Sequence, residues 1–120
     1  MSGRVSVKNT NNYQIFKIFG DFDNLFVYQN KEKICLEINN LKAKDVLFDL
    51  SSCDFIDSSG IGLLLGRYNQ LKNYGANLII CGINPNIKKI IQISGIAKII
   101  DVYEEISEKV IQSGVILWIK

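Results

Sequence analysis

The chain has 120 residues, 48% of them hydrophobic, and its 14 basic and 12 acidic side chains leave a net charge of +2. We expect one globular domain over residues 1–120, with enough apolar residues for a core, and not a disordered chain. The two signs of charge are interspersed. We therefore expect no nucleic-acid partner, because the nearest approach to a basic patch, Lys88-Lys89, is typical of a solvated helix face.

Targeting and redox signals are weak. The start of the chain is polar, and no apolar run approaches the ~20 residues of a membrane helix, so we expect a cytoplasmic protein without a membrane partner. The three cysteines, Cys35, Cys53 and Cys81, are widely spaced, which indicates small buried side chains and not a disulfide framework or a metal site. Histidine is absent, which excludes a Ser-His-Asp or Cys-His catalytic site.

The first elements are a predicted β-hairpin and a helix. Apolar residues alternate in residues 5–7 and 13–19, and the polar stretch 9–12 supplies a turn. Residues 20–24 break the strand pattern, and either Asp23 or Asn24 caps a helix that runs to about residue 41. Its predicted inner face is Ile34, Ile38 and Leu41.

The middle of the chain is a predicted strand, turn and helix. Residues 45–50 are too apolar to have a wet face, which places this strand in the middle of a sheet. An acidic turn at 54–57 precedes a helix that Ser58 opens and that ends at Tyr74-Gly75. The helix has a predicted apolar stripe at Ile61, Leu64, Leu65, Tyr68 and Leu71.

Strands and helices then alternate. We expect a buried strand at 78–81, a helix that Asn84 and Pro85 begin and that stops near residues 94–95, and a brief strand around 98–102. Such alternation predicts an α/β domain with a largely parallel sheet. The ending, residues 115–119, is apolar and is an extra strand, a segment packed on the core, or a self-association surface. A last helix is expected to turn Ile106, Val110 and Ile111 inward.

Ser58 allows two interpretations. Either its hydroxyl caps the helix, since serine is a favoured N-cap residue, or it accepts a phosphoryl group. A phosphate would add about −1.5 to −2 charges at a helix N-terminus, which tolerates anions. Together with Asp57, and with Asp23 if the two loops converge, it would make the surface acidic enough to repel a partner that binds the neutral serine.

No cofactor or metal is expected. Gly60, Gly62 and Gly66 follow the spacing GxGxxxG, not the GxGxxG of dinucleotide sites. We interpret them as small residues that bring the helix close to the sheet, with Gly60 keeping the approach to Ser58 open. Nothing beside Cys53 would lower the pKa of its thiol. The loop aspartates are interpreted as turn and cap residues and not as metal ligands: Asp21, Asp23, Asp54 and Asp57.

At residues 57–62, DSSGIG, the chain resembles the STAS domain of bacterial anti-sigma factor antagonists, with the sporulation anti-anti-sigma factors of spore-forming bacteria as the nearest branch. The likeness covers roughly residues 5–113 and continues in GDFD at 20–23, LGRY at 65–68, CGINP at 81–85, KK at 88–89 and SGIAKII at 94–100. The resemblance implies a mixed sheet of four or five strands flanked by helices. The segment 25–28 is more apolar than is typical of the family's first helix.

The resemblance also implies a regulatory binding protein and not an enzyme. In the family, the unphosphorylated protein binds an anti-sigma factor that is also a serine kinase, which frees a sigma factor for transcription. Phosphorylation breaks the complex, and a serine phosphatase restores it, a cycle called partner switching. Carried over, Ser58 is the phosphorylated residue and Asp57 orients the site. The implied partner-binding residues are Asp23, Asp57, Ser58, Ser59, Gly60, Ile61 and Gly62.

Two other hypotheses remain. The chain is a STAS scaffold or sensor module of a different bacterial stress-signalling assembly, or it is a small enzyme with Ser58 or Cys53 as nucleophile. The absence of histidine argues against the enzyme.

Overall fold

The computed structural model describes residues 3–41, 44–106 and 118–119. Its first half runs from a hairpin to the two long helices, and its second half continues the alternation of strand and helix that the sequence predicts. In chain order the elements are β1 (Arg4–Asn9), β2 (Tyr13–Phe22), α1 (Asn24–Asn40), β3 (Asp45–Ile56), α2 (Ser58–Lys72), β4 (Leu78–Cys81), α3 (Pro85–Ser94), the 3₁₀ turn η1 (Ile96–Lys98), β5 (Asp101–Tyr103), β6 (Glu105–Ile106) and β7 (Trp118–Ile119).

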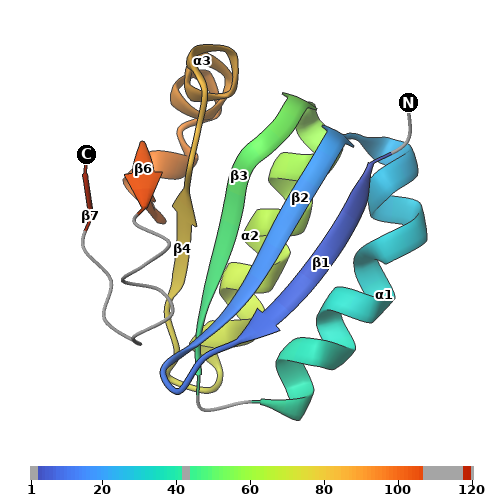
Figure 1. Cartoon of the computed structure of the whole chain (residues 1–120), viewed down its shortest axis with the longest axis vertical. Coiled ribbons are helices and arrows are strands. Elements are labelled where there is room, and N and C mark those ends of the chain that lie inside the picture. Colours follow the sequence, from blue (N-terminus) through green and yellow to red (C-terminus); the bar gives the residue numbers. More distant parts are fainter. Residues whose placement is uncertain (1–2, 42–43, 107–117, 120) are drawn as a thin grey trace.

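Five of the strands form one mixed sheet in the order β1-β2-β3-β4-β5 (Figure 1). The hairpin partners β1 and β2 are antiparallel, and all other neighbours in this sheet are parallel. The expected α/β fold with a mixed sheet is confirmed, and β3 lies in its middle as the apolar sequence predicts. The helices α1 and α2 lie side by side on one face of the sheet (Figure 1). Both begin at the same end of the sheet, because each follows one of the two parallel strands β2 and β3.

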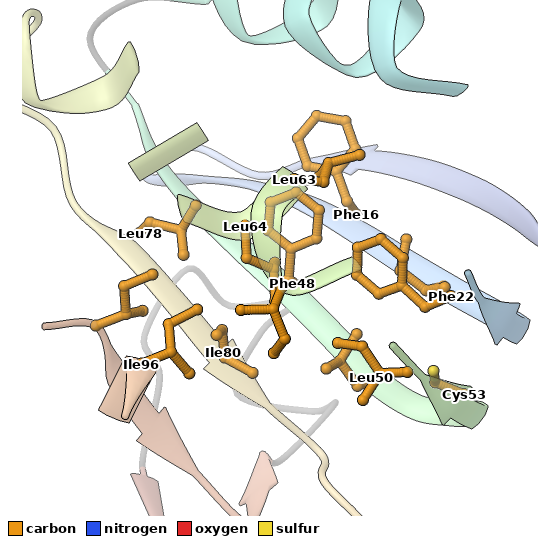
Figure 2. Packing of buried hydrophobic residues seen from close by; sticks show 14 of the residues in the cluster. Phe16, Phe22, Phe48, Leu50, Cys53, Leu63, Leu64, Leu78, Ile80 and Ile96 are labelled. Atoms are coloured by element: carbon orange, nitrogen blue, oxygen red, sulfur yellow. The ribbon is translucent and has the colours of Figure 1, made fainter. Parts of the chain in front are cut away.

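The main core lies between that face and the helices. Side chains on a strand alternate between faces, which brings Phe16 of β2 and Phe48 of β3 to the helices, where their rings stack 5.2 Å apart. Leu63 and Leu64 of α2 contribute to the same cluster (Figure 2). Burying each such side chain stabilises the fold by about 1.5–3 kcal/mol. This packing fixes where α1 and α2 begin.

The opposite face of the sheet is buried around β3 and β4, whereas on β1 it carries the exposed Arg4, Ser6 and Lys8. Ile15, Leu47, Ile79 and Cys81 form a second cluster there. Burial on both faces is the reason that β3 has no continuous polar side. Asp49 is the polar residue within the apolar stretch 46–50 of β3. Its side chain is only 5% exposed and accepts a hydrogen bond from the Ser51 backbone N–H at 2.9 Å.

Two strand ends differ from the prediction. β2 continues to Phe22 and β3 to Ile56, so the expected break at 20–24 and acidic turn at 54–57 are wrong in extent. The two strands pair beyond the break signals, with Phe22 opposite Ile56, after register shifts near residues 18 and 20. Inter-strand hydrogen bonds outweigh the local preference of glycine and aspartate for turns.

The C-terminal part also differs. The strand expected around 98–102 is present as β5 but begins only at Asp101, because Lys98 is the last residue of the 3₁₀ turn η1, whose N-cap is Gly95 with φ of 76°. Ile106 lies in β6, which pairs with β7, and not in a helix. The other inward positions of that helix, Val110 and Ile111, lie outside the described residues, as does 115–117 of the apolar ending. Among the described helices, none has the length and apolar character needed to cross a membrane.

Candidate functional site

The candidate site lies where β2 and β3 end side by side and α1 and α2 begin. Asp23 is the N-cap of α1 and accepts a hydrogen bond from the Phe26 backbone N–H at 3.0 Å. Asp57 is the N-cap of α2 and accepts from the N–H groups of Ser59 at 2.8 Å and Gly60 at 3.2 Å. Each carboxylate satisfies amides that have no partner within their helix, so Asp23 and Asp57 hold the two helix N-termini in place.

Three contacts join the two loops. The Ser59 hydroxyl donates to Asn24 Oδ1 at 3.4 Å, and the Asp57 backbone N–H donates to the Phe22 carbonyl at 3.4 Å. The third contact is the close approach of the Gly60 backbone to Phe22, where a Cβ on Gly60 would lie only 2.6 Å from the Phe22 carbonyl oxygen. The loops therefore converge, as the acidic-surface interpretation of Ser58 requires.

Ser58 is the first residue of α2 and is exposed. Because Asp57 already caps the helix, the interpretation of Ser58 as its N-cap is wrong. Within the described part of the chain, the Ser58 hydroxyl has no hydrogen-bond partner. It is an accessible hydroxyl at the positive end of a helix dipole.

The other predicted site residues differ in exposure. Gly62 is exposed and Ser59 is half-buried, whereas Gly60 and Ile61 are buried. Gly60 therefore does not keep an approach to Ser58 open; it allows α2 to start against Phe22. The interpretation of Gly62 and Gly66 as residues that bring the helix close to the sheet is also wrong, because a Cβ at either position would meet nothing within 4 Å among the described residues.

Metal and thiol chemistry find little support here. In residues 3–41, 44–106 and 118–119, no group of three or more Cys, Asp or Glu side chains is placed to hold a metal ion. Burial and, to a smaller extent, the nearby Asp54 and Asp21 carboxylates raise the pKa of the Cys53 thiol to about 11, against the lowering effect of its hydrogen bonds to the backbone. The thiol donates to the Phe55 carbonyl at 3.2 Å. It stays protonated at neutral pH, which removes it as a nucleophile.

A groove that the sequence did not predict lies beside these loops, and we call it the α1–α2 groove. Its most buried lining residues are Leu63 and Arg67, and its volume is about 260 Å³. Arg67 follows Leu63 by four residues and precedes Leu71 by four, and this helical spacing was the signal for its burial. The groove is lined by Asn24, Val27 and Lys31 of α1 and by Ser59, Gly62, Leu63, Gly66 and Arg67 of α2.

Near the same loops, α1 carries exposed apolar side chains. Tyr28 is 87% exposed and Leu25 49% exposed, whereas Phe26 between them is fully buried. The apolar segment 25–28 thus contributes one side chain to the core and two to the surface beside the α1–α2 groove.

The fold and this pair of capped helices belong to a known class. The model of the STAS domain family matches residues 4–109, and the chain is a member of that family. Curated relatives are anti-sigma F factor antagonists of Paenibacillus polymyxa, 24% identical over 87% of this chain and 89% of the relative, and of Lysinibacillus sphaericus, 32% identical over 68% and 70%. An anti-sigma-B factor antagonist of Listeria monocytogenes is 26% identical over 85% and 88%.

Solved structures agree on the fold. The anti-sigma factor antagonist SpoIIAA in its unphosphorylated form has a TM-score of 0.71 and 23% identity, over 92% of this chain and 97% of that one. The phosphorylated form of Bacillus SpoIIAA has a TM-score of 0.69 and 24% identity, over 92% and 98%. The relatives are regulators that antagonise another protein and not enzymes, in agreement with the expectation for this chain.

Proposed function

We propose that this chain is a cytoplasmic anti-sigma factor antagonist, one STAS domain over residues 1–120, that phosphorylation of Ser58 switches off. Unphosphorylated, it binds an anti-sigma factor that is also a serine kinase, and so releases a sigma factor for transcription. The kinase transfers the γ-phosphoryl group of ATP to Ser58 Oγ, the hydroxyl proton is lost and ADP leaves; a serine phosphatase restores the hydroxyl. The observation that carries the proposal is the exposed Ser58 hydroxyl at the start of α2, in a chain whose relatives are such antagonists.

The local electrostatics support a switch that changes binding without unfolding the domain. The helix dipole favours an anion at the first residue of α2. Asp57 already accepts the N–H groups of Ser59 and Gly60, so a phosphate on Ser58 adds its charge beside an existing carboxylate. A partner surface that fits the neutral serine then meets a concentrated negative charge, which costs binding free energy.

The proposed docking surface is the exposed rim around Ser58. We propose that Asp23, Asp57, Ser59 and Gly62 form this surface with Ser58, and that the exposed apolar side chains of α1, Leu25 and Tyr28, extend it. The buried Gly60 and Ile61 act indirectly, by fixing the start of α2 against β2.

Two variants of one residue test the switch. Ser58→Ala is expected to bind the anti-sigma factor but to resist inactivation by ATP, whereas Ser58→Asp is expected to bind at least tenfold more weakly. Ser59→Ala is the matched control for phosphorylation and not for affinity, because it removes the neighbouring hydroxyl, which belongs to the docking surface, and leaves the acceptor. Anti-sigma F and anti-sigma-B factors are the partners to test, with binding measured by calorimetry. Equal affinities of Ser58→Ala and Ser58→Asp would contradict the proposal.

Locating the phosphate completes the test. After incubation with the kinase and ATP, tandem mass spectrometry is expected to find one phosphate, on Ser58, in the unsubstituted and Ser59→Ala proteins. A STAS scaffold of another stress-signalling assembly would instead leave Ser58 unmodified by this kinase. Purification of the complex from the native cell would then recover partners other than an ATP-binding anti-sigma factor.

A further inference from the structure

In the described part of the chain, no packing contact requires glycine at two positions of the α1–α2 groove. Gly62 and Gly66 are about one turn apart inside α2, and a Cβ at either position would meet nothing within 4 Å among the described residues. Alanine would favour the helix at both positions. Glycine there keeps the α2 backbone accessible over one turn, which allows a second molecule to approach the helix closely.

The groove also carries an unsatisfied positive charge. Arg67 is 9% exposed, and its Nε and Nη1 atoms are buried without a hydrogen-bond partner in the described structure. Lys31 adds a second cation to the lining, and no carboxylate is among the lining residues. Burying a guanidinium without acceptors is costly. A carboxylate is the group whose two oxygens match the planar fork of arginine.

The position of the groove indicates where this carboxylate comes from. The groove begins at Asn24 and Ser59, beside the proposed docking surface, and reaches Arg67, which is about 13 Å along the helix from Ser58 at 1.5 Å per residue. A protein that covers Ser58 therefore extends over the groove. Its volume of about 260 Å³ suits a side chain and not a further helix or strand.

We infer that the α1–α2 groove binds an aspartate or glutamate side chain of the anti-sigma factor, with Arg67 as the principal donor and Lys31 as a supporting cation. This inference rests on the proposed function and adds a second contact to it. The caps Asp23 and Asp57 present negative charge at one end of the interface, and the groove presents positive charge at the other. Such an alternation fixes the register in which a partner docks.

Three variants of this chain test the inference. Arg67→Met removes the guanidinium and keeps the length of the side chain, and we expect binding to weaken about tenfold to a hundredfold. Arg67→Lys keeps the charge but not the fork, and is expected to recover only part of the loss. Gly66→Ala is expected to weaken binding while its unfolding midpoint stays equal or rises. Thermal unfolding of each variant checks the fold, and Asn69→Ala is the control, because Asn69 is exposed on α2 and does not line the groove.

The partner supplies the decisive measurement. Each exposed Asp and Glu of the anti-sigma factor is replaced by alanine and combined with Arg67→Met in a double-mutant cycle. We expect one carboxylate whose removal has little further effect once Arg67 is absent.

Additivity at every carboxylate, or a normal complex with both Arg67→Met and Gly66→Ala, would overturn the inference and leave the Ser58 switch intact. Failure of the unsubstituted chain to bind any anti-sigma factor would overturn both. If Arg67→Met does not fold, Gly66→Ala and Lys31→Glu decide the outcome, because Lys31 is exposed.

Discussion

Asp23 and Asp57 have the same backbone conformation, with φ of −118° and −117° and ψ of −170° and −172°. Each follows the last residue of one of two adjacent parallel strands, Phe22 or Ile56, and each caps the helix that comes next. The candidate site is thus built from two equivalent strand-cap-helix units side by side. Because both caps are carboxylates, each helix N-terminus already has one negative charge beside it in the unphosphorylated chain, and a phosphate on Ser58 would add its own charge to these two.

The two caps are expected to contribute unequally to stability. Asp57→Ala removes the acceptor of two amides and Asp23→Ala the acceptor of one, and losing an N-cap costs about 0.5–2 kcal/mol. Urea unfolding should therefore show a larger loss for Asp57→Ala. Asp54→Ala is the control, because Asp54 is exposed, and its effect should stay within about 0.5 kcal/mol. A larger loss in Asp23→Ala would contradict this account.

Glycines that are two residues apart in α2 should respond in opposite directions. In Gly60→Ala the new Cβ would lie 2.6 Å from the Phe22 carbonyl oxygen and 2.8 Å from Ile56 Cγ1, and overpacking of this kind costs about 1–3 kcal/mol. In Gly62→Ala the methyl group has open space and the helix gains about 0.5–1 kcal/mol. Chemical denaturation of both proteins measures the difference. A stable Gly60→Ala protein would mean that α2 can move away from β2.

Asn84 is expected to stabilise the domain in two ways. Its Oδ1 accepts from the Ile87 backbone N–H at 2.9 Å and caps α3, and its Nδ2 donates to the Cys53 carbonyl at 3.0 Å. Asn84→Ala loses both bonds and should cost about 1–2 kcal/mol. Asn84→Ser keeps a capping oxygen but is too short to reach β3, so its unfolding free energy should lie between those of the alanine variant and the unsubstituted chain. Equal losses of unfolding free energy in Asn84→Ala and Asn84→Ser would mean that the whole effect comes from the hydrogen bond to β3.

The stability of the domain should fall at alkaline pH through Cys53. Its pKa is raised to about 11 in the folded chain from a reference of 9.0, so the folded state holds its proton more tightly than the unfolded state. The resulting stabilisation is complete below about pH 9 and is lost as the pH rises toward 11, on the order of 2 kcal/mol over that range. Urea unfolding in reducing buffer from pH 8 to 11 should show a shallower decline for Cys53→Ala. Equal declines of the unfolding free energy with pH in the unsubstituted and Cys53→Ala proteins would contradict this prediction. Tyrosines and lysines titrate in both proteins and cancel in the comparison.

Local pattern was sufficient for most elements up to α3, although not for their exact ends. The alternation at 13–19 and the Asn84-Pro85 start of α3 depend on neighbours within a few residues, and the structure confirms them. Of the two caps that the pattern allowed for α1, Asp23 and Asn24, the structure has Asp23. The stretch 45–50 also indicated a central strand, because a strand buried on both faces must be apolar throughout. The family resemblance at residues 57–62 indicated the loop in which we place the candidate site, and the sequence left open whether Ser58 capped the helix.

Only tertiary structure decided what each polar residue at the site does. Parallel pairing carried β2 and β3 past the glycine and aspartate signals to Phe22 and Ile56, and this extra length made Asp57 the cap and left Ser58 exposed. The close approach at Gly60 and the open space at Gly62 differ because one faces β2 and the other faces solvent, which no local pattern distinguishes. For Arg67 two local signals disagree, because its residue type predicts exposure whereas its spacing of four residues from Leu63 and Leu71 indicates the buried side of α2; the tertiary structure decided for burial.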